Sequence, residues 1–106
     1  MIYELREYRT SPHRIDRLHQ RFQEAAMPAW ERHGFGVVAF WTDAEDPNRV
    51  LYVLSFEDHE QRKRAWEGFR ADPEWKAAKE ATEYDGELVE HREVTVLEPT
   101  GYSPLQ

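Results

Sequence analysis

The sequence predicts an α+β fold of the ferredoxin-like type, with the element order βαββαβ in a single domain, residues 1–106. The chain has 106 residues, which is enough for one hydrophobic core and too few for two domains. Its apolar centre consists of two strand-like runs, Val37–Trp41 and Val50–Phe56, separated by the turn-forming cluster Asp43–Asn48. On each side of this hairpin the chain carries a helical pattern and one further strand-like segment.

The N-terminal part of the chain predicts a strand followed by a long helix. Ile2–Arg9 alternates in the way that a strand does. Ser11 is expected to cap the helix and Pro12 to be its first residue, because proline has no N–H to lose there. An apolar stripe with steps of three and four residues continues to about His33. Pro28 lies inside this stripe, so we expect a kink or short break just before it.

Two further helices are predicted after the hairpin. Asp58 and Gln61 have the spacing of a capping box at the start of the second helix. Asp72 and Pro73 are a cap and a first helical residue for a short third helix, which continues to about Ala81.

The last element is a strand, and its position completes the topology. Glu87–Leu97 alternates and is followed by a coil tail, residues 98–106. Right-handed crossovers then give an antiparallel sheet of strand order 4-1-3-2 with both main helices on one face. Both apolar runs of the hairpin carry apolar residues on their two faces, and one layer of helices buries only one side of a sheet. We therefore expect a homodimer in which the sheet faces meet through an isologous contact, and no stable monomer.

Composition excludes several classes of function. The 14 Lys and Arg against 21 Asp and Glu give a net charge of −7 with interspersed signs, so the sequence predicts no binding of nucleic acid. There is no cysteine, which excludes disulfides and thiolate sites. No signal-peptide pattern and no long apolar run are present, so we expect a cytoplasmic protein without a membrane segment. No histidine pair has zinc-site spacing, so no metal and no cofactor are expected.

Several stretches resemble those of bacterial NIPSNAP-family proteins, and together they cover nearly the whole chain. They are Tyr3–Tyr8, Pro28–Gly34, Gly36–Thr42, Asn48–Tyr52, Trp66–Trp75 and the tail Leu97–Pro104. The resemblance implies a dimeric α+β barrel in which two ferredoxin-like sheets pack face to face. It implies a homodimer of unassigned activity that binds a small, partly apolar ligand or a protein partner. The alternative, by analogy with the wider superfamily, is a cofactor-independent monooxygenase or isomerase, so the chain is not assigned as an enzyme on sequence grounds.

Four residues are the ligand-pocket candidates: Tyr8, Trp41, Tyr52 and His91. Trp41 stands at a strand end beside a loop, where a pocket mouth is expected. His91 lies within the last strand, where a satisfied core histidine is favoured over a general base. The other tryptophans stand on helical stripes and are expected in the core.

A charge pattern links the first and last strands. Glu4, Arg6, Glu90 and Arg92 form two cross-strand ion pairs, Glu4–Arg92 and Arg6–Glu90, if opposed residue numbers sum to 96, which is the register without like-charge pairs. We favour a structural ladder, and a polar lining that contacts a ligand inside the barrel is the alternative.

Overall fold

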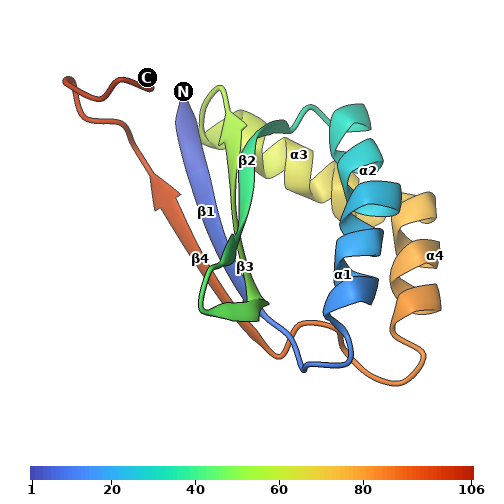
Figure 1. Cartoon of the computed structure of the whole chain (residues 1–106). Helices are drawn as coiled ribbons and strands as arrows, with labels where there is room; N and C mark the ends of the chain where they lie inside the picture. The colour runs from blue at the N-terminus through green and yellow to red at the C-terminus, as the bar shows by residue number, and fades with distance from the viewer.

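The computed structural model describes residues 1–106 and shows the predicted order of elements (Figure 1). These are β1 (Ile2–Arg9), α1 (Ile15–Arg21), the π-helical turn η1 (Phe22–Ala26), α2 (Met27–Arg32), β2 (Gly36–Asp43), β3 (Asp46–Phe56), α3 (His59–Ala71), α4 (Pro73–Thr82) and β4 (His91–Leu97). The strands form one antiparallel sheet of order β2-β3-β1-β4, which is the predicted 4-1-3-2 order counted from the opposite edge. The predicted ferredoxin-like topology is confirmed.

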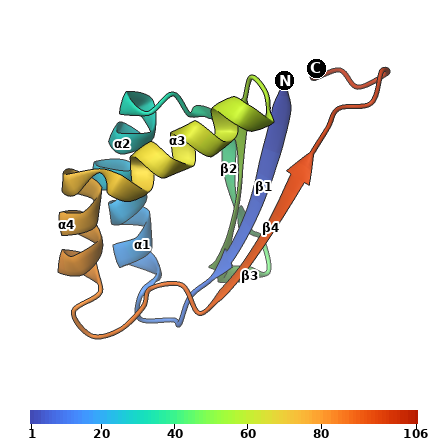
Figure 2. The ribbon, with the colours of Figure 1, turned by 180° about the vertical axis from the view of Figure 1, so that it is seen from behind.

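All helices cover one face of the sheet, and no helix covers the other face, as Figures 1 and 2 show from opposite sides. Even-numbered residues of β1 and β3 point at the helices and include the fully buried Tyr52, Leu54 and Phe56. Trp30 and Phe35 pack on them from the helix side with stacked rings 5.8 Å apart. We call the opposite side, with the odd-numbered residues of β1 and β3, the open face.

The cap predictions for the two later helices are confirmed, and the one for the first helix is wrong. The Asp58 side chain accepts from the Gln61 N–H at 2.8 Å at the start of α3. Asp72 caps α4, which begins at Pro73. Ser11 does not cap α1: its carbonyl accepts from the Arg14 N–H at 3.1 Å, so Ser11 to Arg14 form a turn and the helix begins only at Ile15.

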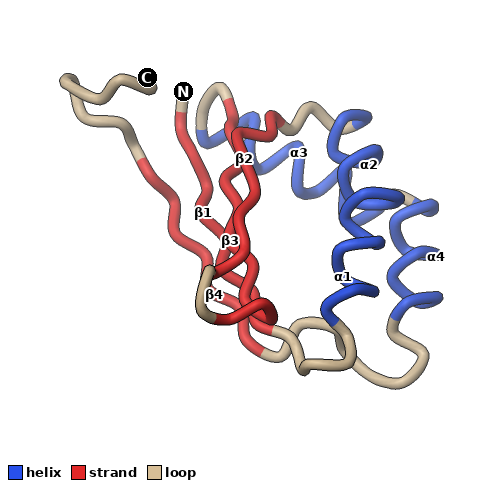
Figure 3. Tube along the Cα trace, in the orientation of Figure 1, coloured by secondary structure: helices blue, strands red, loops and turns tan.

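The predicted break before Pro28 takes the form of a π-helical turn. In η1 the N–H of Met27 donates to the carbonyl of Phe22, an i→i+5 bond. Such turns are a recognised way to absorb a local irregularity within an α-helix. The helical path therefore continues from α1 to α2 with one wider turn, as the tube in Figure 3 shows.

The predicted register of β1 and β4 is wrong, because opposed residue numbers sum to 100. Glu4 lies opposite Val96, Arg6 opposite Val94 and Arg92 opposite Tyr8. The prediction avoided like charges between the two strands, but the structure sets Glu7 opposite Glu93, and Glu7 is paired with Arg49 of β3 at 2.6 Å instead. Arg49 on β3 therefore offsets the repulsion between Glu7 and Glu93, whereas the prediction considered only charges on β1 and β4.

The last strand is also shorter than predicted and begins at His91 rather than Glu87. Leu88 and Val89 come before it and are buried in the core, while the N–H of Glu90 donates to the carbonyl of Arg9 at 2.8 Å. Glu90 therefore does not lie opposite Arg6, and the predicted charge ladder between the two strands is not formed.

His33 follows the last residue of α2, and its ring bonds to Asp72, with Nε2 2.8 Å from Oδ2. Asp72 also accepts from the backbone N–H groups of Glu74 and Trp75 and from Arg32. The hydrogen bond to His33, followed by the Trp75 N–H and Arg32, holds the pKa of Asp72 well below its usual range. This one carboxylate joins the end of α2 to the start of α4.

We expect Asp72→Ala to lower the free energy of unfolding at neutral pH and to lower it much less in acid. A carboxylate with a lowered pKa in the folded state contributes stability that is fully present above its unfolded-state pKa of ~3.9 and is lost as the pH falls through the folded-state pKa. The difference in unfolding free energy between wild type and variant should be constant above about pH 5 and shrink below about pH 4. Urea denaturation at a series of pH values measures this. A difference that stays constant down to about pH 3 would contradict it.

Candidate functional site

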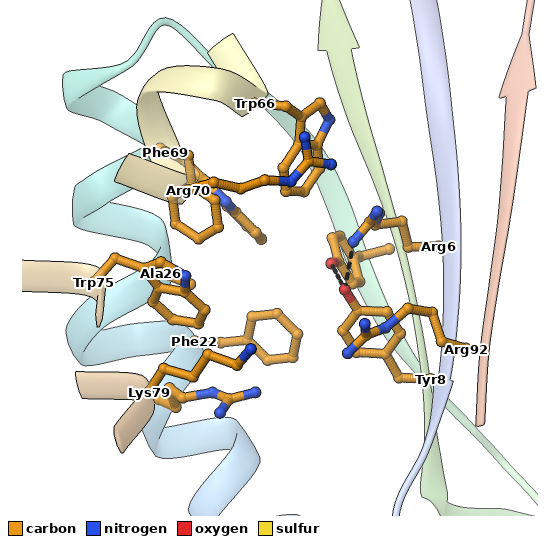
Figure 4. A pocket seen from close by; sticks show the side chains of 13 residues that line it. Arg6, Tyr8, Phe22, Ala26, Trp66, Phe69, Arg70, Trp75, Lys79 and Arg92 are labelled. Atoms are coloured by element: carbon orange, nitrogen blue, oxygen red, sulfur yellow. Dashed lines mark hydrogen bonds between the residues drawn. The ribbon is translucent and has the colours of Figure 1, made fainter. Parts of the chain in front are cut away.

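A cleft of about 170 Å³ lies between the sheet and the helices (Figure 4). The sheet contributes one wall, and the helical elements from α1 to α4 contribute the other. The lining residues are Arg6, Tyr8, Arg21, Phe22, Ala26, Trp30, Tyr52, Trp66, Phe69, Arg70, Trp75, Lys79 and Arg92. The set combines aromatic rings with cationic side chains and contains no carboxylate and no histidine.

Three polar side chains meet on the sheet side of the cleft. The Tyr8 hydroxyl oxygen accepts from Arg6 Nη1 at 2.7 Å and bonds to the Tyr52 hydroxyl at 2.8 Å, as the dashed lines in Figure 4 show. One of the two phenolic protons is sufficient for the bond between the tyrosines. The other is therefore available to an acceptor in the cleft.

Arg6 is held in place by the buried carboxylate of Glu4. Glu4 is fully buried, and its Oε2 accepts from Arg6 Nε at 2.6 Å. Its other oxygen accepts from Arg62 at 2.6 Å and from the indole N–H of Trp66 at 2.9 Å, both on α3. The Arg6 guanidinium also lies over the Trp66 ring, 4.3 Å from its centre. This cluster, Glu4, Arg6, Arg62 and Trp66, ties the middle of the sheet to α3.

The surroundings of Tyr52 and Arg6 keep each of these two side chains in one protonation state. Burial raises the pKa of Tyr52 well above its ordinary value, so its phenol stays neutral. Burial acts to lower the pKa of Arg6, but its interactions with Tyr8, Tyr52 and Glu4 outweigh this and raise it, so Arg6 stays a cation. The cleft therefore presents hydrogen-bond donors and positive charge rather than a base.

The structure separates the four predicted pocket residues into two pairs. Tyr8 and Tyr52 line the cleft. Trp41 is 53% exposed on the open face, in a shallow groove with Tyr3 and residues of the C-terminal tail. His91 lies opposite Arg9, also on the open face.

Two members of the predicted charge ladder reach the cleft from separate elements. Arg6 lies on β1 and Arg92 on β4, where its guanidinium is 5.3 Å from the centre of the Tyr8 ring. Trp30 and Trp66 are buried as expected, and Trp75 stacks on Phe69 at 4.6 Å. Trp30 and Trp66 belong to the core, whereas Trp75 is only partly buried and packs against it. All three tryptophans form part of the cleft wall.

Sequence reasoning missed the cationic residues that the helices contribute, namely Arg21, Arg70 and Lys79. Arg21 follows the apolar stripe of α1 and is buried, pairing with Glu83 at 3.1 Å. No signal in the sequence separates Arg70 from the other cationic residues of α3. Only the packing of α4 against α1 brings Lys79 to the same place.

The structure contains no cluster of three or more His, Asp or Glu side chains that could hold a metal ion. None of its helices combines the length and the apolar character that crossing a bilayer requires.

Comparison with known proteins identifies the family and the fold. The NIPSNAP family profile matches residues 3–104. An uncharacterized NIPSNAP domain protein from Burkholderia xenovorans is 23% identical with a TM-score of 0.83, and the alignment covers 98% of this chain and 99% of that one. A NIPSNAP family protein from Agrobacterium tumefaciens is 20% identical with a TM-score of 0.86, covering 99% and 98%.

A more distant likeness shows how widely the fold occurs. A putative antibiotic biosynthesis monooxygenase from Deinococcus radiodurans is 17% identical with a TM-score of 0.68, covering 100% of this chain and 99% of that one. No curated protein matches the chain. Because the family profile covers nearly all of its residues, this chain belongs to the NIPSNAP family.

Proposed function

We propose that the protein is a homodimer that binds a small, partly apolar molecule in the cleft between the sheet and the helices. The observation that carries this is the composition of the cleft: aromatic walls surround the Arg6, Tyr8 and Tyr52 group. An apolar cavity with a few convergent polar groups is the usual form of a ligand site. Protein-partner binding, the other function weighed from sequence, has no comparable feature to support it.

The enzymatic alternative, a cofactor-independent monooxygenase or isomerase, has weaker support. Such chemistry requires a group that removes a proton from the substrate within hydrogen-bond reach. The cleft lining contains no Asp, Glu or His, and Tyr52 is held neutral by burial. The similarity to monooxygenases is below 25% identity and concerns the fold alone.

The four tryptophans provide a test of where a ligand binds. Trp30, Trp66 and Trp75 line the cleft, whereas Trp41 lies on the open face and serves as the internal control. In a small-molecule screen followed by the indole N–H signals in NMR, binders should shift Trp66 and Trp75 and leave Trp41 unchanged. Binders that shift Trp41 alone would contradict the proposed site.

The open face supports the homodimer. The register sets Leu5 opposite Val53 and Val53 opposite Ala39, which gives an apolar row across three strands with Leu51 and Trp41 beside it. No helix of the same chain covers this row (Figure 2). A second copy would bury it against an identical surface, through a two-fold contact.

We expect Val53→Arg to convert the dimer to a monomer, because it places an unpaired charge at the centre of the apolar row. Light scattering measures the change, with wild type at the dimer mass. Val96→Arg is the matched control: Val96 is 38% exposed but lies on the helix side of β4, so its variant should remain a dimer. A wild-type monomer at micromolar concentration would contradict the proposed assembly.

A further inference from the structure

The charge of the cleft is opposite to that of the whole chain. The protein carries a net charge of −7, yet five of the 13 cleft-lining residues are cationic and none is acidic. They are Arg6, Arg21, Arg70, Lys79 and Arg92. A cleft that is lined by charges of one sign and has apolar walls focuses the field and attracts a ligand of the opposite sign.

Three of these cations have no carboxylate partner within 4.0 Å. Arg6 is paired with Glu4 and Arg21 with Glu83, but Arg70, Lys79 and Arg92 form no ion pair. They belong to α3, α4 and β4, so three elements that are far apart in sequence bring unpaired positive charge to one cavity. Figure 4 shows the three side chains around the cleft.

Aromatic rings hold two of the three unpaired cations. The Arg70 guanidinium lies 5.4 Å from the centre of the Trp66 ring, and that of Arg92 lies 5.3 Å from the centre of the Tyr8 ring. An aromatic face holds a cation by electrostatic attraction, and no carboxylate then neutralises the positive charge. Both guanidinium groups therefore keep their N–H donors free for an anion, and the spare phenolic proton of the Tyr8 and Tyr52 pair adds a neutral donor.

The walls and the volume define the rest of the ligand. Phe69 and Trp75 stack with ring centres 4.6 Å apart on the helix side, and Tyr8 and Tyr52 form the sheet side. Such surfaces favour a flat, apolar body. The volume of about 170 Å³ is below the ~300–1,000 Å³ of ordinary ligand pockets, so it suits one ring rather than several.

We propose that the ligand is a small organic anion, a carboxylate carried on a single flat ring. Its negative charge is attracted by the unpaired cations Arg92 and Arg70, the phenolic hydroxyl is a neutral donor to it, and its ring packs between the aromatic walls. This inference rests on the proposed function of the cleft as the binding site, and it adds the chemical class of what binds.

A pair of probes with the same shape and different charge tests the class. Benzoate and benzamide are titrated against the full chain, and the indole N–H signals of Trp66, Trp75 and Trp41 are followed by NMR. Benzoate should shift the two cleft signals and bind about tenfold more tightly than benzamide, because hydrogen bonds to an ionised group are about twice as strong as neutral ones. Inorganic phosphate, an anion without an apolar body, should bind more weakly than benzoate.

Each other result overturns one identifiable part of the argument. Equal binding of benzamide and benzoate in the cleft would overturn the anionic class and leave the cleft as a ligand site. Phosphate as tight as benzoate would overturn the flat apolar body. No shift at Trp66 or Trp75 with either ring compound would count against the proposed function itself.

Two variants assign the recognition to named side chains. Arg92→Gln and Arg70→Gln should each reduce benzoate binding by about tenfold and leave benzamide binding unchanged. Arg64→Gln is the control, since Arg64 is 64% exposed on α3, pairs with Glu60 and does not line the cleft. Equal losses in all three variants would indicate a general charge effect and overturn the assignment. All three residues are exposed, and thermal melting confirms that each variant is folded.

Discussion

Glu4→Gln is expected to lower the free energy of unfolding by about 3–5 kcal/mol, because it removes one charge from a buried ion pair and leaves its partners behind. Glu4 is fully buried and accepts from Arg6, Arg62 and Trp66. Glutamine has almost the same shape, but its amide group presents donors to side chains that are themselves donors. Urea denaturation with the linear extrapolation measures the loss.

Glu7→Gln is the matched control for this prediction. Glu7 stands three residues further along β1 on the open face, where it pairs with Arg49 and keeps 21% exposure. Water screens and replaces such a contact, so the expected loss is about 1 kcal/mol or less. Equal losses for the two variants would show that the burial of Glu4 is not what makes its ion pairs important.

Trp30→Ala is expected to cost about 3–5 kcal/mol, the range for truncating a large buried aromatic residue. Trp30 is 2% exposed and has Phe22, Phe35, Phe40, Tyr52 and Phe69 around it with ring centres 5.5 to 6.1 Å away. Its removal leaves a void where five rings meet, and these rings are too rigid to fill it. The same denaturation experiment measures the effect.

Trp30→Phe should be much less destabilising than Trp30→Ala. The indole Nε1 of Trp30 is the one buried side-chain nitrogen or oxygen in the structure without a hydrogen-bond partner. A buried unpaired donor costs free energy, so phenylalanine removes that cost while keeping most of the ring contacts. Equal losses of unfolding free energy for Trp30→Phe and Trp30→Ala would contradict this and show that the indole N–H of Trp30 is itself stabilising.

The topology and the later helix caps could be predicted from the sequence because both depend on local chemistry. Asp58 and Asp72 are short acceptors placed directly before helical patterns, and they cap the helices that follow. The continuous apolar run Val50–Phe56 indicated a central strand, and β3 lies inside the sheet with every second residue of this run buried. The other run, Val37–Trp41, belongs to the edge strand β2, which has no buried residue. The caps and the strand run are decided by neighbouring residues, and the topology then follows from the order of the elements and the right-handed crossover rule.

The register and the cleft could not be predicted, because both depend on contacts between distant segments. Glu4 was paired with Arg92 on the assumption that only neighbouring strands neutralise a charge, whereas α3 supplies Arg62 and Trp66 from above. Arg70 and Lys79 look like ordinary solvated residues of two helices until the packing of those helices brings both to one cavity. The register was predicted from the charges of β1 and β4 alone, and contacts with the helices and with the third strand of the sheet were not included.

The π-helical turn η1 explains how the continuous helical path of α1, η1 and α2 lines the cleft from Arg21 to Trp30. Leu18, Phe22, Ala26 and Trp30 follow each other in steps of four, and in a regular helix of 3.6 residues per turn three such steps drift by about 120° around the axis. The wider turn at η1 takes up part of this angular drift, so Phe22 and Trp30 stay on the same side with their rings 6.0 Å apart. The aromatic wall of the cleft is therefore kept in phase by a local unwinding of the helix.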